Sequence, residues 1–223
     1  MKRQKENKME KTTILLVRHG ESEGNALRVF TGHRGLPLTP MGHKQAEATA
    51  NYIKQNYHVD AVYSSDLPRA FQTAEHIALQ FDLPVVTNAG LREIYAGQWE
   101  NKPIAKLPEL YPEDFSVWLN NIYYSRCTGG ESVQELIARV YQCLLDLAKK
   151  HPGECIVVAS HATPIRSLLW KISDSEPEAF KQINFGCNCA VSELKFENGV
   201  FQTVCANYRE HLSDCETMLP SNV

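Results

Sequence analysis

Two short, uninterrupted apolar runs constrain the fold of this chain more than any other feature. Residues 14–17 (ILLV) and 155–159 (CIVVA) are apolar at every position. A strand that is apolar on both faces must be covered on both sides, which is typical of a parallel strand inside an α/β sheet. The sequence therefore predicts a single α/β domain with a mostly parallel central sheet, helices on both faces and a small helical or irregular lid.

The segments around these runs indicate alternating strands and helices. Apolar spacing predicts a helix that begins after Thr39, with Pro40 in its first turn, and further helices at residues 68–81, 132–150 and 164–171. Shorter strands are expected at 59–63 and 83–86, the latter at a sheet edge because it contains proline. Asn198-Gly199 predicts a hairpin between strands at 190–196 and 200–206. Residues 21–40 are expected to form a long loop, and residues 94–130 the lid.

Composition restricts the possible partners. The chain has 223 residues and a net charge of −3, which offers nothing to attract nucleic acid or an anionic membrane. No apolar run reaches the ~18 residues of a membrane-spanning helix. Residues 1–11 are charged and lack the apolar part of a secretory signal, so we expect a solvated tail, a domain at 12–223 and a cytoplasmic protein.

The seven cysteines have neither an even number nor the spacing of a disulfide framework. Cys143 and Cys155 fall in apolar segments, so we expect reduced core residues there. Cys187 and Cys189 could ligate a metal, or could pack together on one face of a strand. We favour packing, because no further pair of thiols or imidazoles follows at zinc-site spacing.

Charged and polar side chains follow both buried strands directly. Arg18 and His19 come after the first apolar run, and Ser160 and His161 come after the second. The carboxyl ends of parallel strands form the edge at which α/β sheets bind ligands. If the two strands are neighbours, both imidazoles and a guanidinium lie at one site.

A third strand end adds Arg69, in the first turn of the helix expected at 68–81. The helix dipole disfavours a cation at that position, so either an anion binds there or Arg69 is a surface residue paired with Asp66. The sequence leaves both possibilities open.

Taken in order, these segments resemble the histidine phosphatase superfamily, also called phosphoglycerate-mutase-like, from about residue 14 to the last strands. Each motif alone is weak, but several in the same order are specific. The motifs are Arg18-His19-Gly20, Ser22 and Asn25 in HGESEGN, Pro37-Leu38-Thr39 with Gly42, SSDLPRAFQTA, LREIYAGQWE and Ser160-His161.

The resemblance implies a phosphomonoester hydrolase that acts on a small phosphorylated metabolite through a phosphohistidine. His19 would attack phosphorus, and Arg18, Arg69 and His161 would hold the phosphoryl oxygens. Glu93 would match the proton donor to the leaving oxygen. A carboxyl group donates only when it holds a proton, so we expect Glu93 to be buried rather than a surface charge.

Three more residues complete the expected substrate-binding set. Asn25 would donate to the phosphate, Ala162 would present its backbone N–H, and Ser22 would mainly order the loop. No metal and no cofactor is expected, because two guanidinium groups and two imidazoles supply the positive charge. The expected partner is a small phosphorylated substrate, and the oligomeric state stays open.

The chain departs from the family pattern in three loops. Ala162 stands where glycine usually follows the second histidine, and alanine fits there if its φ is negative. Gly35 stands where an aspartate often precedes Pro-Leu-Thr, and Asn101 where glycine often follows Trp-Glu. These differences concern loop geometry and leave the catalytic set intact.

Two alternative functions remain. A cofactor-dependent phosphoglycerate mutase is one, but the segment 99–131 has few cations and ends in the Gly130-Glu131-Ser132 element of the phosphatases. A regulatory phosphate-binding module without turnover is the other, and the complete catalytic set argues against it. The lid aromatics either bind the leaving group or form lid core; they are Trp99, Trp118, Tyr123 and Tyr124, with Arg28, Phe30 and Arg126 as weaker rim candidates.

Overall fold

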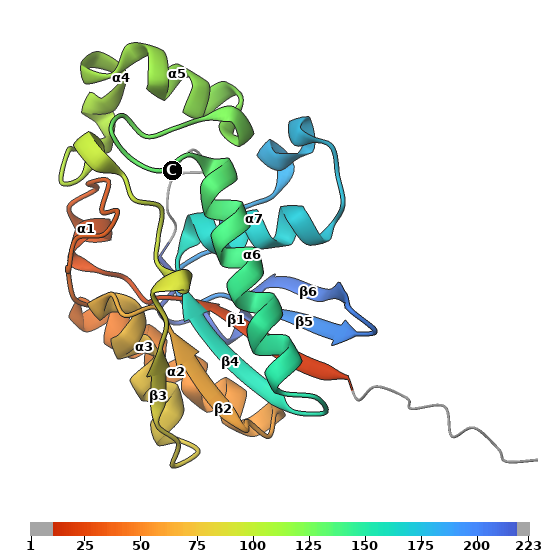
Figure 1. The fold of residues 1–223 in the computed structure, drawn as a ribbon. Helices are drawn as coiled ribbons and strands as arrows, with labels where there is room; N and C mark the ends of the chain where they lie inside the picture. The colour runs from red at the N-terminus through yellow and green to blue at the C-terminus, as the bar shows by residue number, and fades with distance from the viewer. Residues whose placement is uncertain (1–10, 218–223) are drawn as a thin grey trace, which may run out of the picture.

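The computed structural model describes residues 11–217, and Figure 1 gives the order of the elements. The strands are β1 Thr12–Arg18, β2 Ala61–Ser64, β3 Val85–Thr87, β4 Cys155–Ser160, β5 Val191–Glu197 and β6 Val200–Tyr208. The α-helices are α1 Glu23–Ala26, α2 Pro40–Asn56, α3 Pro68–Leu79, α4 Leu107–Leu110, α5 Pro112–Asn120, α6 Val133–Lys150 and α7 Ala162–Ile172.

One six-stranded sheet has the order β3-β2-β4-β1-β5-β6. The four strands from β3 to β1 are parallel to one another, while β5 runs antiparallel to both β1 and β6. The mostly parallel sheet predicted from the apolar runs is confirmed, as is the edge position of the short strand that follows Pro84. The hairpin turns at Asn198 and Gly199, which both have positive φ.

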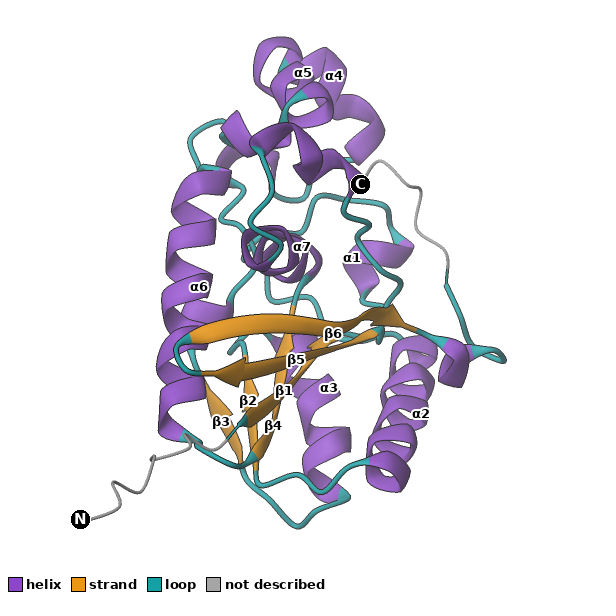
Figure 2. Ribbon diagram, turned by 90° about the vertical axis from the view of Figure 1, so that its right-hand side faces the viewer, coloured by secondary structure: helices purple, strands orange, loops and turns teal. Residues whose placement is uncertain are grey.

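The uninterrupted apolar runs arise because both faces of the sheet are covered. Ile14 and Leu16 of β1 belong to the core under α6 and α7, while Leu15 and Val17 belong to the core under α2 and α3. Figure 2 shows these helix pairs on opposite sides of the sheet. Alternate side chains of β1 thus enter two different cores, and none of those four is exposed.

Helix caps fix where the longest helices begin. Thr39 Oγ1 accepts from the backbone N–H of Gly42 at 3.0 Å, with Pro40 as the first helical residue. Ser132 and Glu135 form a capping box at the start of α6. The predicted start after Thr39 is confirmed, and α6 begins one residue after the predicted position because Ser132 is its cap.

Two expectations need correction. The segment 21–40 is not entirely a loop, because Ser22 and Asn25 form a capping box that starts the short helix α1. Cys187 and Cys189 do not share a strand face, since Asn188 and Cys189 form a turn before β5. Residues 1–10 of the expected tail lie outside the described part. Within residues 11–217 no helix has the length and apolarity needed to cross a membrane.

The lid projects from the sheet at the end where α4 and α5 lie, as both ribbon views show. Its core is an aromatic cluster of Phe30, Trp99, Phe115 and Trp118, with ring centroids 5.4–5.7 Å apart in edge contacts. Asn101, at the position where the family often has glycine, has a φ of 61°. Asparagine tolerates this left-handed region better than most residues, which explains how the substitution is accommodated.

Candidate active site

The two strand-end histidines lie side by side. Strands β1 and β4 pair in parallel with Arg18 opposite Ser160, so His19 and His161 follow at the same level of the sheet. Their ring centroids are 5.2 Å apart, and both residues are buried. The two strands are neighbours, so both imidazoles lie at one edge of the sheet, as predicted for that case.

Close backbone packing holds the turn after His19. A Cβ at Gly20 would lie 2.5 Å from the carbonyl oxygen of Gly42, so only glycine allows this approach of the turn to the start of α2. The backbone N–H of Gly20 donates to Thr73 Oγ1 at 3.0 Å, and Asn188 Nδ2 donates to the His19 carbonyl at 3.0 Å. The turn is therefore fixed by α2, α3 and the segment before β5.

The hydrogen bonds of His19 select one tautomer. Nδ1 lies 2.7 Å from the Gly20 carbonyl oxygen, which only accepts, so Nδ1 carries the proton. Nε2 then holds a lone pair, and Arg69 Nε donates to it at 3.3 Å. Burial and the charges of Arg69 and Arg18 hold the pKa of His19 well below 6.5. The imidazole is neutral at pH 7, with its lone pair beside two guanidinium groups.

Both guanidinium groups are held by backbone carbonyls. Arg69 Nη1 and Nη2 donate to the carbonyl oxygens of Arg34 and Gly32 at 2.9 and 2.8 Å, and Arg18 Nη1 donates to that of Gly186 at 2.7 Å. Burial lowers the pKa of Arg18 and of Arg69 to about 10, so both stay charged at pH 7.

Arg69 is not the surface partner of Asp66. It is 1% exposed, whereas Asp66 forms its ion pair with Arg92. Of the two possibilities left by the sequence, the surface pair is wrong.

His161 faces a polar strand end. Its Nε2 lies 2.8 Å from Ser65 Oγ, at the end of β2. Burial, together with Arg69 and His19, holds the pKa of His161 well below 6.5. Within the described residues, His161 Nδ1 and Arg18 Nε are buried without a hydrogen-bond partner. The hydrogen-bonding capacity of these two atoms is therefore not used by any described residue.

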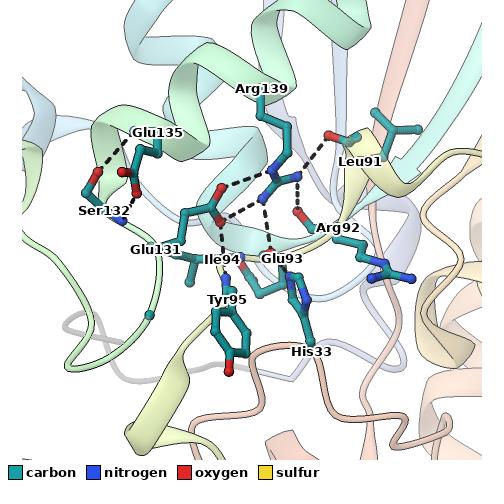
Figure 3. Close-up of polar contacts among 12 residues, drawn as sticks. His33, Leu91, Arg92, Glu93, Ile94, Tyr95, Glu131, Ser132, Glu135 and Arg139 are labelled. Carbon is teal, nitrogen blue, oxygen red and sulfur yellow. Dashed lines mark hydrogen bonds and ion pairs between the residues drawn. The ribbon is translucent and has the colours of Figure 1, made fainter.

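Glu93 is held both through its carboxylate and through the backbone of its segment. It is 9% exposed, and its Oε1 accepts from the N–H of Ile94 at 2.9 Å. Arg139 of α6 donates to the carbonyl oxygens of Gly90, Arg92 and Glu93 at 3.0–3.3 Å. Figure 3 shows Arg139 reaching the main chain beside Glu93 while its other donors bind Glu131.

His33 supports the same segment from the opposite side. Its Nε2 lies 2.8 Å from the Glu93 carbonyl oxygen, and Figure 3 places its ring next to Glu93. Glu131 Oε2 also accepts from the N–H of Tyr95 at 3.1 Å. Backbone groups on both sides of Glu93 are therefore fixed.

Most of these side chains line one cavity of about 360 Å³. Arg18, His19, Arg69 and Glu93 line it, as do Asn25 and Ala162 of the expected binding set. Asn25 Oδ1 accepts from Ser22 and Asn188, which leaves Asn25 Nδ2 to donate. Ala162 is the first residue of α7, where φ is negative, so alanine is accommodated without strain.

The remaining candidates divide between the cavity and its support. Ser22 and His161 are fully buried and are not lining residues; Ser22 caps α1, and His161 precedes α7. Arg28, Phe30 and Trp118 line the cavity, whereas Trp99 is lid core. The other three lie elsewhere: Tyr123 packs on Trp170, Tyr124 is exposed, and Arg126 pairs with Glu135.

Several residues that support the site do so through contacts that no sequence motif predicts. Ser65 and Thr73 stand within SSDLPRAFQTA but were not assigned a role there. Asn188 stands between Cys187 and Cys189, and no motif there marks its contact with His19. Arg139 and His33 contact backbone atoms, and such contacts leave no pattern of paired residue types. Only the fold reveals the contacts of these five residues.

Comparison with known proteins agrees with this geometry. The family model described as "Histidine phosphatase superfamily (branch 1)" matches residues 14–209. The chain is 33% identical to phosphoserine phosphatase 1 of Hydrogenobacter thermophilus, over 82% of this chain and 86% of that protein. It is 35% identical to phosphoglycerate mutase-like protein 4 of Arabidopsis thaliana, over 78% of this chain and 77% of that one.

A solved structure shares the fold. The phosphoserine phosphatase of Entamoeba histolytica in complex with 3-phosphoglyceric acid superposes with a TM-score of 0.80. Its sequence is 31% identical, and the match covers 90% of this chain and 99% of that one.

Proposed function

This chain belongs to the histidine phosphatase superfamily and is a phosphatase of small phosphorylated metabolites, and we propose that it works through a phosphohistidine formed on His19. The observation that carries the proposal is the state of that imidazole. A neutral ring with its Nε2 lone pair beside two cations is a nucleophile placed where a phosphate dianion would bind.

Arg18 and Arg69 would hold the phosphoryl group. Negative charge on the equatorial oxygens persists through the transition state, so fixed cations near those oxygens lower the barrier. Further hydrogen-bonding positions would come from Arg18 Nε, Asn25 Nδ2 and the backbone N–H of Ala162, which belong to lining residues, and from the unpartnered His161 Nδ1. Because both imidazoles are neutral without a bound anion, the resident positive charge comes from the two guanidinium groups.

Glu93 would manage the proton of the leaving group. As His19 Nε2 bonds to phosphorus, the bond from phosphorus to the alcohol oxygen breaks, and Glu93 gives that oxygen its proton. The resulting carboxylate then takes a proton from water. The water oxygen bonds to phosphorus, the N–P bond breaks, and inorganic phosphate leaves with His19 restored.

Replacing His19 tests the nucleophile. His19→Ala should lose all measurable hydrolysis of p-nitrophenyl phosphate, and rapid quenching of the wild type should trap an acid-labile phosphohistidine. His43→Ala is a matched control, because His43 lies on α2 and pairs with His76 instead of lining the cavity. An active His19→Ala enzyme would contradict the assignment.

Two assays separate the alternative functions. With 2,3-bisphosphoglycerate added, we expect no appreciable conversion of 3- to 2-phosphoglycerate, because Arg126 in the lid is bound to Glu135 and Gly130 and offers no second phosphate site. Efficient conversion would favour the mutase. Absence of phosphate release from a broad phosphomonoester panel would favour a binding module.

A further inference from the structure

The cavity has a polar end and an apolar remainder. Beyond the residues proposed to act on the phosphoryl group, its wall consists mainly of aliphatic and aromatic side chains from the 24–32 segment, the lid and the segment before β5. The principal ones are Leu27, Val29, Phe30, Ile104, Trp118 and Phe185. Whatever is esterified to the phosphate lies against this surface.

The wall of the cavity beyond the phosphoryl site carries few charged side chains. Among the described lining residues, Arg28 is the sole charged side chain outside the proposed catalytic set, and it is exposed to solvent. In the described part of the chain, Glu93 is the sole carboxylate that lines the cavity, and it is already assigned to the leaving oxygen. A carboxylate or ammonium on the leaving group would therefore lose its water without gaining a buried counter-charge.

The apolar wall is preformed. Phe30 packs edge-on against Trp118 and Trp99, each at 5.4 Å between ring centroids. The backbone N–H of Phe30 donates to the Lys102 carbonyl at 2.9 Å, and that of Ile104 to the Arg28 carbonyl at 3.0 Å. These bonds tie the 28–30 segment to the lid, so the surface exists without a ligand, as is usual for small-molecule sites.

The apolar lining continues to the cavity mouth. Leu27, at the end of α1, lines the cavity and is 68% exposed. The fold gains little from an aliphatic side chain left in water, whereas an apolar ligand would cover it. The volume of about 360 Å³ lies near the lower end of the range for ligand pockets, roughly 300–1,000 Å³.

We propose that the preferred substrate is the phosphomonoester of an uncharged, mainly apolar alcohol. Its phosphate lies at His19, and its carbon skeleton lies along Phe30, Trp118 and Ile104 towards Leu27. The inference rests on the proposed function and narrows it. It sets this chain apart from the phosphoserine phosphatases that it resembles, because the described lining residues offer a charged amino acid no buried counter-charge on this wall.

Four primary alkyl esters test the proposal with similar leaving-group chemistry. They are 2-phenylethyl phosphate, ethyl phosphate, O-phosphoserine and glycerol 3-phosphate. We expect kcat/KM for 2-phenylethyl phosphate to exceed that of each of the others by at least about 10-fold. A higher value for phosphoserine or glycerol 3-phosphate, or an equal value for ethyl phosphate, would overturn the inference and leave the phosphatase standing.

Failure of the proposed function would look different. In that case the wild type would release phosphate from none of the four esters, nor from p-nitrophenyl phosphate, and both claims would fall together.

A pair of matched variants checks that the wall itself sets the preference. Ile104 and Ile172 are both partly buried against the same core, but Ile104 lines the cavity and Ile172 does not. Ile104→Ser should reduce the preference for 2-phenylethyl over ethyl phosphate by roughly 10-fold, mainly through KM. Ile172→Ser should keep that ratio. Equal ratios in the two variants would count against the proposal.

Discussion

Replacing Arg139 tests whether Glu93 depends on a residue outside the cavity. Arg139 donates to the carbonyl oxygens of Gly90, Arg92 and Glu93 at 3.0, 3.1 and 3.3 Å. Arg139→Met keeps most of the apolar stem and removes every donor. The segment that carries Glu93 then loses its attachment to α6.

The magnitude follows from the bonds removed. Each hydrogen bond to a carbonyl contributes about 1 kcal/mol to the free energy of unfolding. The ion pair with Glu131, whose side chains are 27% and 14% exposed, adds at most about 1 kcal/mol. We expect a loss of about 3–4 kcal/mol, which lowers Tm by roughly 10 °C in a domain of this size.

Catalysis should change in a way that a purely structural defect does not. An alkoxide must be protonated as it leaves, whereas p-nitrophenolate leaves without a proton. A shift of Glu93 by about 1 Å should lower kcat for ethyl phosphate roughly 100-fold. For p-nitrophenyl phosphate kcat should fall by less than about 10-fold, because the acid contributes little there. The assay compares kcat for the two substrates at a temperature where the variant is folded.

Arg126→Met supplies the matched control. Arg126 also pairs with a glutamate of α6, Glu135, and donates to the Gly130 carbonyl, so its side-chain hydrogen bonds go to groups outside residues 90–95. It should leave the ratio of the two kcat values unchanged. Equal losses on both substrates in Arg139→Met, or the same altered ratio in Arg126→Met, would refute the positioning role.

Two further predictions concern pH and metal. The native state keeps His19 and His161 neutral while the unfolded chain protonates them below pH 6.5, so unfolding takes up protons and stability falls with decreasing pH. Below pH 6.5, each histidine adds about 1.4 kcal/mol per pH unit to the slope of the unfolding free energy against pH. Urea unfolding of His161→Asn should therefore give a slope smaller than that of the wild type by about this amount. Equal slopes would contradict the prediction. Dialysis against EDTA should leave p-nitrophenyl phosphate hydrolysis intact, and a large loss would require a metal.

Local physics made much of the fold predictable. The apolar runs in β1 and β4 reflect burial on both faces, and the side chain of Thr39 marks a helix start whatever the tertiary structure. The same locality limits what could be predicted. The adjacency of β1 and β4 is a matter of sheet order, so local patterns predict only that His19 and His161 meet if these two strands are neighbours.

Elements with weak local signals were missed. The capping box of α1 uses Asn25 at its third position, where glutamate or glutamine is the usual signature, and α1 is four residues long. The spacing of Cys187 and Cys189 fits either a pair of metal ligands or two side chains on the same face of a strand. Its actual importance lies in Asn188 between them, whose side chain holds the His19 carbonyl. No composition or periodicity marks such a contact.

The arginines illustrate why the site's electrostatics could not be deduced from paired residue types. One of the two possibilities for Arg69 was a surface pair with Asp66, yet a carboxylate bound directly to Arg69 would cancel the charge that an anion needs. Carbonyl oxygens instead fix Arg69 and Arg18 in place. A carbonyl accepts a hydrogen bond and carries no net charge, so both guanidinium groups are oriented and their positive charge remains available to a phosphate.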